Sequence, residues 1–360
     1  MKKSAFLFII ILVIPFTMLR AQDEISIFIN ESTVDANKIA QAYGTPLLKS
    51  LGTDFNNGWI NSANPMNFGE FDIRLVTTAS FAPQTDKTFD FHSLNLTHFQ
   101  SSENELPTIF GSTTNAELTV LGTSDDGAEL EVVGNYNIPT LEAGGFPFVM
   151  PQVDIGLFKG TELMIRGLPP MDMPTLNDDL RQMETTYWGV GFKHDIKQWM
   201  PGIKLLPFSW SIYGTMSNAN FVLNGPLWEP ADIEDAFDNN SLTNPNPENY
   251  NAQKMEFDTK GYSIGTVVSK KLPVVTFFGC LEYSASTTSL AMTGPYPYAN
   301  TDNEIEHVFD VINLEQDNSQ FGITGGVRFK LLILSISASA TYAPNAYSSA
   351  NIVIGLGNFR

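Results

Sequence analysis

Segments of alternating apolar and polar residues constrain what this chain can fold into more than any other feature. In LPFSWSIYGTMSNANF, residues 206–221, Phe208 and Trp210 lie on one face of an extended chain, and Ser209 and Ser211 lie on the other. The same period of two recurs at 71–81, 161–168, 186–195, 273–286, 321–330 and 332–342. This period is that of β-strands with two chemically different faces.

The polar face of these segments distinguishes a membrane barrel from a soluble β-sandwich. A soluble sheet turns its polar face to water, but here this face carries mostly Ser, Thr, Gly and Tyr with single charges. A hydrated, crowded barrel interior has this composition, with the apolar face against lipid. Segments of about ten residues suffice for a tilted crossing, and closure is required because hydrocarbon satisfies no open strand edge. A secreted β-sandwich or soluble barrel is the alternative.

The connections between the segments favour the membrane barrel independently. Long, acidic, Asn- and Pro-rich connections at 169–185, 224–258 and 293–318 alternate with short ones that carry Lys or Arg. Long loops at one rim and short turns at the other are typical of outer-membrane barrels. We expect an all-β, antiparallel up-and-down transmembrane barrel of about 12–14 strands over residues 68–360, an even number being usual. Residues 89–151 fit strands, an insert into the lumen, or both.

The first residues have the pattern of a secretory signal peptide, residues 1–21. A short basic start precedes the apolar run 5–16, and Ala21 is a small residue at the expected cleavage site. An N-terminal anchor helix is the alternative, but the run is short for a span. Cleavage removes three basic residues and no acidic one from a chain whose net charge is −19. This acidity argues against nucleic acid as a partner, because phosphate contacts need a basic face.

The segment after the expected cleavage site, residues 22–67, is interpreted as a helical plug. Apolar residues recur at helical spacing between Asp35 and Leu51, and Pro46 is expected to kink or split this helix. The surface that we expect to face a ligand or to gate the lumen consists of Ile39, Tyr43, Leu47, Leu48 and Trp59.

Single charged residues on the lumen faces are a second group of candidate site residues. They are Asp72, Arg74, Asp154, Glu162, Arg166, Lys193, Glu282, Arg328 and Lys330. Rings of charge tune the selectivity of pores, but the same charges can instead pair across a plugged interior, and the sequence favours neither. The single cysteine, Cys280, is expected to face the lumen beside Glu282 as a small filler.

The sequence contains no arrangement that indicates catalysis or metal binding. His194 and Asp195 fall at an expected periplasmic turn, far from an outer-rim hydrolase site, and no G-x-S-x-G elbow occurs. His92 and His98 lack the spacing of a zinc site, and residues 301–306 lack the glycine turn of a calcium loop. We therefore expect no enzymatic activity, no metal and no cofactor.

The overall plan resembles that of the long-chain fatty acid transporter family. The resemblance rests on a signal peptide, a helical segment ahead of the first strand and the size of the barrel. It implies an outer-membrane barrel that carries hydrophobic compounds past an N-terminal plug. The phrases GLFKGTELMIRGLPP (156–170) and WGVGFKHDIKQWMPGIKLLPFSWSIYG (188–214) also resemble an uncharacterised group of Bacteroidetes outer-membrane proteins. The end of the chain departs from the usual barrel signal, because Arg360 follows Phe359.

Two functions fit these features. The first is passive uptake of a small hydrophobic ligand past the plug, in the outer membrane of a Gram-negative bacterium and surrounded by its lipid. The second is a non-transporting scaffold that binds a surface-protein partner through the acidic loops. We expect the first, because the plan of the chain matches it.

Overall fold

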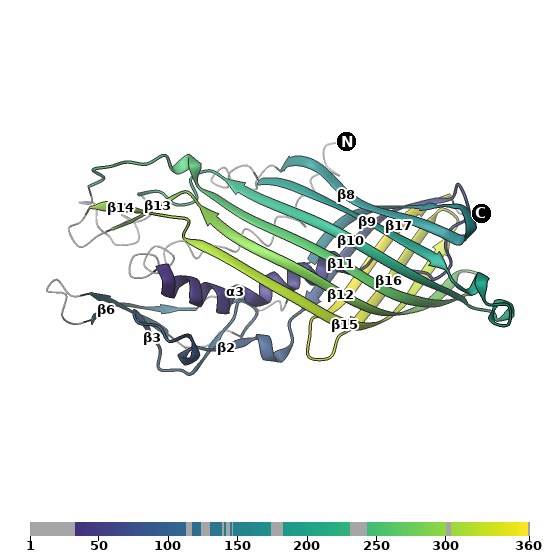
Figure 1. Cartoon of the computed structure of the whole chain (residues 1–360), viewed down its shortest axis with the longest axis horizontal. Helices are drawn as coiled ribbons and strands as arrows, with labels where there is room; N and C mark the ends of the chain where they lie inside the picture. Colours follow the sequence, from purple (N-terminus) through teal and green to yellow (C-terminus); the bar gives the residue numbers. More distant parts are fainter. Residues whose placement is uncertain are drawn as a thin grey trace.

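Ten of the chain's strands form one antiparallel sheet that closes on itself. The computed structural model describes residues 33–358 apart from 113–116, 124–129, 139, 142–144, 146, 174–182, 231–242 and 300–303. The barrel strands are β1 (Phe71–Phe81), β7 (Pro147–Gly156), β8 (Thr161–Met173), β9 (Met183–Asp195), β10 (Ser209–Asn224), β11 (Lys254–Lys271), β12 (Val275–Thr293), β15 (Ile312–Leu331), β16 (Leu334–Tyr342) and β17 (Ser348–Gly357). They pair in the order β1, β17, β16, β15, β12, β11, β10, β9, β8 and β7, and β7 pairs with β1 to close the barrel (Figure 1).

The connections at the two ends of the barrel differ in length, as predicted. At the end where the C-terminus lies, the turns are short and fall at 157–160, 196–208, 272–274 and 332–333 (Figure 1). At the opposite end lie the long connections 225–253 and 294–311, together with one short turn at 343–347. We call these the short-turn end and the long-loop end.

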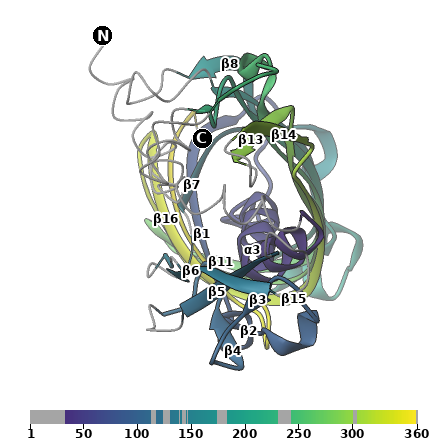
Figure 2. The same cartoon turned by 90° about the vertical axis from the view of Figure 1, so that its left-hand side faces the viewer.

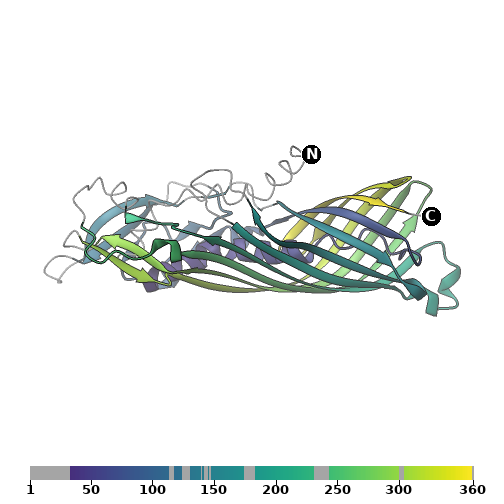
Figure 3. The same ribbon diagram turned by 90° about the horizontal axis from the view of Figure 1, so that it is seen from above.

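One side of the barrel wall is about twice as tall as the other. Strands β16 and β17 have 9 and 10 residues, whereas β12 and β15 have 19 and 20. At about 3.3 Å per residue and a tilt near 40°, roughly ten residues cross about 25 Å, the height of the apolar band of such barrels. Strands β10, β11, β12 and β15 therefore continue beyond that band toward the long-loop end (Figures 1 and 3).

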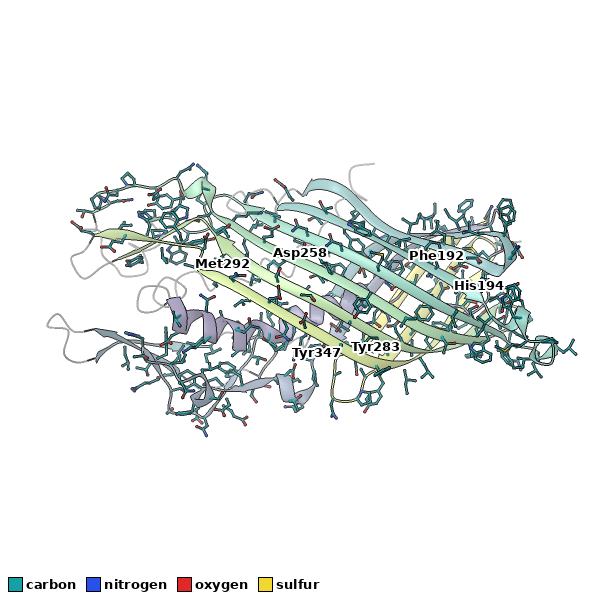
Figure 4. All side chains as sticks on the ribbon, in the orientation of Figure 1. Phe192, His194, Asp258, Tyr283, Met292 and Tyr347 are labelled. Carbon is teal, nitrogen blue, oxygen red and sulfur yellow. The ribbon has the colours of Figure 1, made fainter. Side chains whose placement is uncertain are left out.

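The faces of the strands alternate as predicted. On β1 the outward side chain of Ile73 is 53% exposed and the inward side chain of Arg74 only 2%. On β15 the outward Phe321 is 73% exposed and the inward Gln320 only 7%. Large apolar side chains project outward around the short-turn half, among them Phe192, which is labelled in Figure 4. A soluble protein does not expose an apolar belt of this extent, so the chain is a transmembrane β-barrel.

The N-terminal helix lies inside the barrel. Helix α3 (Thr33–Asn56) is surrounded by the wall when the molecule is viewed along its long axis (Figure 2). Of the two outcomes expected at Pro46, a kink or a split, the split does not occur, since the helix continues through this residue. Proline removes a single hydrogen bond there, while contacts with β12 and β15 support the helix. Among the described residues, no helix is long and apolar enough to cross a bilayer.

The residues between β1 and β7 do not enter the barrel wall. Strands β2 (Thr88–Asp90), β3 (Phe99–Gln100), β4 (Glu105–Pro107), β5 (Glu117–Thr123) and β6 (Leu130–Asn137) pair only with one another in the described part of the chain. The barrel thus has ten strands and not about 12–14. The reason is that these strands are too short to cross a bilayer, and their apolar side chains pack against Ile39 of α3.

The remaining elements lie in the connections. Strands β13 (Pro295–Ala299) and β14 (Ile305–Phe309) form a hairpin at the long-loop end. Single 3₁₀ turns occur at Gln84–Asp86, His92–Leu94, Phe158–Gly160, Lys197–Trp199, Ile203–Leu205 and Tyr250–Ala252. The expected signal peptide, residues 1–21, lies outside the described residues, as do residues 22–32, Phe359 and Arg360.

Candidate functional site

The segment that follows α3 is held in the lumen by polar side chains of the wall. Residues 57–67 continue from the helix to the start of β1, and we call α3 together with this segment the plug. Inward side chains of β1, β7, β8, β9 and β15 surround it. This charged collar consists of Asp72, Arg74, Gln152, Asp154, Glu162, Arg166, Lys193 and Arg328.

Arg74 connects two strands of the wall to the plug. Its guanidinium forms an ion pair with Asp154 and donates a hydrogen bond to the backbone carbonyl of Trp59 at 3.1 Å. The amide of Gln152 donates to the same carbonyl at 3.3 Å and to Asp154 at 2.6 Å. All three side chains are at least nine-tenths buried, so bulk water does not compete for these bonds.

Lys193 and Glu162 hold the next part of the plug. The two side chains form an ion pair of 2.8 Å between Nζ and Oε1. Lys193 also donates to the carbonyl of Ser62 at 3.1 Å, and Glu162 accepts from the backbone N–H of Met66 at 2.9 Å. The pair therefore uses both its cation and its anion to bind plug backbone.

Arg328 repeats this arrangement on β15. It pairs with Asp72 at 2.9 Å and donates to the side-chain oxygen of Asn61 in the plug at 3.3 Å. Lys330, two residues closer to the short-turn end, is half-buried. Three strand cations thus each bind one strand carboxylate and one group of the plug.

Arg166 lies at the C-terminal end of α3. Its guanidinium carbon is 4.0 Å from the centre of the Trp59 ring, and it donates to the carbonyl of Phe55 at 3.4 Å. The last turn of α3 contains no basic residue, although the free carbonyls of a helix C-terminus carry partial negative charge. The barrel wall supplies the cation that the helix itself lacks.

The collar answers the question that the sequence left open about its charges. Buried ions are costly unless they are paired and hydrogen-bonded, and the collar combines four cations with three carboxylates. Arg166 is the collar cation that forms no ion pair with a collar carboxylate. It instead faces the carbonyl of Phe55 and the ring of Trp59. The charges therefore pair across a plugged interior.

Glu282 and Cys280 lie on β12, apart from the collar. The hydroxyl of Tyr213 donates to Glu282 at 2.7 Å. Cys280 is buried in an apolar cluster that also contains Trp59 and Ile60 of the plug. Its position is that of the small lumen-facing filler predicted from the sequence.

On the long-loop side of the collar, an apolar and aromatic cluster lies between α3 and one part of the wall, among buried Ser, Thr and Asn side chains of the remaining strands. The ring of Phe55 lies 5.0 Å from that of Phe148, 5.2 Å from that of Tyr187 and 6.0 Å from that of Phe221. Further members of this Phe55 cluster are Leu48, Leu51, Val76, Met150, Ala219, Phe257, Leu314 and Val353. Offset and tilted aromatic contacts of this kind stabilise the packing beyond the area that they bury.

The five residues predicted to face a ligand do not form one surface. Leu47 and Leu48 lie together at the Phe55 cluster. Ile39 packs on the strands between β1 and β7, and the carbonyl of Tyr43 accepts from the N–H of Ile109 at 3.2 Å. Trp59 is buried closer to the short-turn end, beside Arg166.

Sequence reasoning missed Phe55, Asn61, Ser62 and Gln152. Phe55 could have been found, because it extends the helical apolar spacing of Leu48 and Leu51 by one turn. Ser62 acts through its backbone carbonyl, and Asn61 and Gln152 act through side-chain amides whose partners lie far away in the sequence, so no local pattern marks them. Among the described residues, no group of three or more His, Cys, Asp or Glu can hold a metal ion.

The fold and this site define a transmembrane β-barrel whose lumen is occupied by its own N-terminal segment. The chain belongs to the family of unknown function DUF6588, which matches residues 1–358. None of the curated proteins matches the sequence. The family assignment therefore supplies no activity.

The fold is similar to that of several solved outer-membrane proteins. They include the attachment invasion locus protein Ail of Yersinia pestis (10% identity, 81% of this chain and 97% of that chain, TM-score 0.26). The outer membrane transporter YddB from Escherichia coli is another (11% identity, 77% and 39%, TM-score 0.29). A third is the toluene transporter TodX of Pseudomonas putida (8% identity, 88% and 97%, TM-score 0.24).

Proposed function

We propose that this protein lies in the outer membrane of a Gram-negative bacterium and takes up small hydrophobic compounds passively past its plug. The observation that carries the proposal is the order of surfaces along the lumen. The apolar Phe55 cluster occupies the long-loop side, and the charged collar that grips the plug lies beyond it. An apolar ligand that enters from the long-loop end would thus meet the apolar cluster between α3 and the wall before it reaches the charged collar.

The plug is fixed by bonds that can be exchanged. Most of its hydrogen bonds to the collar use backbone carbonyls and amides, such as those of Trp59, Ser62 and Met66. When such bonds break, water can replace the lost partner, whereas the strand ion pairs remain in place. In our proposal a ligand that packs against Leu47, Leu48 and Phe55 displaces α3, and the collar then releases the segment behind it.

A reversible covalent lock between plug and wall tests this proposal. The hydroxyl oxygens of Ser50 on α3 and Ser80 on β1 are 2.6 Å apart, and disulfide sulfurs lie about 2.05 Å apart. In a Cys280→Ser background, Ser50→Cys with Ser80→Cys should form a disulfide. Uptake of the hydrophobic probe N-phenyl-1-naphthylamine into proteoliposomes should stop on oxidation and return on reduction.

The controls separate the lock from the substitutions. Each single cysteine variant in the Cys280→Ser background should take up the probe equally under oxidising and reducing conditions. Equal uptake by the oxidised and reduced double variant, with the disulfide verified by mass spectrometry, would show that passage does not require plug movement. The proposal would then be abandoned.

A further inference from the structure

The outer face of the tall wall changes character along one line. On β9, β10, β11, β12 and β15 the outward residues are mostly apolar or aromatic on the short-turn side of this line and mostly polar on the long-loop side. On β15, for example, the outward-facing residues that follow Phe321 toward the long-loop end are Ser319, Asp317 and Glu315. Figure 4 labels Tyr283 and Asp258, which lie on the two sides of the line. The line marks where lipid tails end and headgroups begin.

A hollow opens on the outer face at this line. It has a volume of about 630 Å³ and spans β9 to β15. Tyr262 lies opposite Ala285, and Ala285 opposite Ser319, in one row across the strands. The two small side chains leave room between the larger ones that flank them, Trp188 and Tyr283 among them.

One side of the hollow is aromatic. Trp188 and Tyr262 are 46% and 55% exposed, and the ring centre of Tyr283 lies 4.9 Å from that of Phe321. Such amphipathic rings prefer the interface between lipid and water.

The polar side of the hollow carries both signs of charge. Asp317 accepts a hydrogen bond from the hydroxyl of Thr287 at 2.6 Å. Lys260, whose side chain is 72% exposed, lies 3.4 Å from Asp258 at the rim. Asn218 adds an amide that can both donate and accept.

We propose that this hollow binds the phosphorylated sugar headgroup of an outer-leaflet glycolipid. The inference takes the membrane to be the outer membrane, as proposed above, but it does not depend on uptake. The exposed rings present flat faces to sugar rings, Asn218 and Asp317 bond hydroxyls, and Lys260 meets a phosphate. The acyl chains lie against the apolar face below, which a free oligosaccharide cannot use. The position at the lipid line is what favours a lipid over a soluble sugar.

Native mass spectrometry of the delipidated full chain in mild detergent tests this site. The probes are a diphosphorylated diglucosamine glycolipid (lipid A), its dephosphorylated form, phosphatidylethanolamine, and the deacylated headgroup saccharide. Lipid A should bind at least about tenfold more tightly than phosphatidylethanolamine, which is about 1.4 kcal/mol. The deacylated saccharide should bind at least tenfold more weakly than lipid A.

Variants then locate the binding. Ala285→Leu fills the hollow and should remove the preference for lipid A, whereas Ala338→Leu, at another exposed outward alanine on β16, should keep it. Lys260→Gln should abolish discrimination between the phosphorylated and dephosphorylated lipid. Equal affinity of the unaltered protein for both lipids, unchanged binding by Ala285→Leu, or saccharide binding as tight as that of lipid A would each overturn the proposal.

Discussion

Arg74 donates a 3.1 Å hydrogen bond to the backbone carbonyl of Trp59 while its guanidinium also pairs with Asp154. One side chain therefore joins β1, β7 and the plug. The acceptor in the plug is a carbonyl, so this tie is independent of the side chain at position 59. The stacking of the Trp59 ring on Arg166 does depend on that side chain. The plug is thus held by its backbone and oriented by one aromatic ring.

The first prediction concerns the loss of this tie. Arg74→Met leaves the Asp154 carboxylate buried with Gln152 as its remaining partner. Removing one member of a buried ion pair typically costs about 3–5 kcal/mol, and we expect a loss of this size in the free energy of unfolding in urea. In the double variant with Asp154→Leu most of the loss should be recovered. A double variant as unstable as the single one would show that the pair is not the cause.

The second prediction concerns Asp54, at the end of α3. Its side chain is fully buried, with the Ser80 and Thr78 side chains and the Ser80 backbone as its polar neighbours. Burial strongly disfavours the ionised form of this carboxyl, whereas the unfolded chain exposes it ionised at pH 7. Asp54→Asn keeps the shape and removes this cost, so it should raise the free energy of unfolding in urea at pH 7 by about 1–3 kcal/mol.

A second carboxylate on the same helix is the control for this prediction. Asp35 accepts from the backbone N–H groups of Thr97 at 2.7 Å and His98 at 3.2 Å and pairs with Lys38. Asp35→Asn should therefore destabilise the protein. If Asp54→Asn destabilises to the same extent, the carboxylate of Asp54 is stabilised by its surroundings and the argument fails.

The strand faces were predictable because they follow from local period. Whether Ile73 or Arg74 faces the lumen depends only on the alternation within β1, which the sequence shows directly. The number of barrel strands depends on partners. Strands such as β2 and β4 have ordinary strand composition, and their shortness and their pairing with each other became visible only in the structure.

The contacts of the plug could not be predicted from local pattern. Arg328 and Asn61 meet across 267 positions of sequence, and the carbonyls of Trp59 and Ser62 are acceptors that every residue type carries. The strand period does place the charges on the lumen face. It does not show which atoms of the plug lie opposite them, so the sequence fits both a pore whose charges select a permeant and an interior whose charges pair.

The third prediction uses a close approach between strand and plug. A Cβ on Gly189 would lie 2.9 Å from the Trp59 ring and 3.1 Å from the carbonyl of Met216. Gly189→Ala should therefore displace the ring, destabilise the protein by about 1–3 kcal/mol in urea unfolding, and raise probe uptake in proteoliposomes. At Gly214 the nearest heavy atom would be 3.8 Å away, so Gly214→Ala should leave both unchanged. Equal effects of the two variants would contradict the role of the contact.

The last prediction concerns pH and the β13–β14 hairpin at the long-loop end. The hydroxyl of Tyr250 and Nε2 of His307 are 2.8 Å apart. Burial lowers the pKa of His307 below 6.5, and the nearby carboxylates of Glu248 and Glu306 only partly oppose this. His307 in the unfolded hairpin therefore binds a proton more readily than His307 in the folded one. The contribution of the neutral imidazole to the stability of the folded hairpin is complete above pH 6.5 and is lost as the pH falls through the lowered pKa.

Hydrogen exchange measures this loss locally. The amides of Tyr296, Tyr298, Ala299 and residues 304–309, corrected for intrinsic rates, should be less protected at pH 5.5 than at pH 7.5. His307→Gln, which keeps a hydrogen-bonding side chain but cannot titrate, should show the same protection at both values. If His307→Gln loses protection at pH 5.5 as the unaltered chain does, the loss cannot come from protonation of His307, and another group controls the stability of the hairpin.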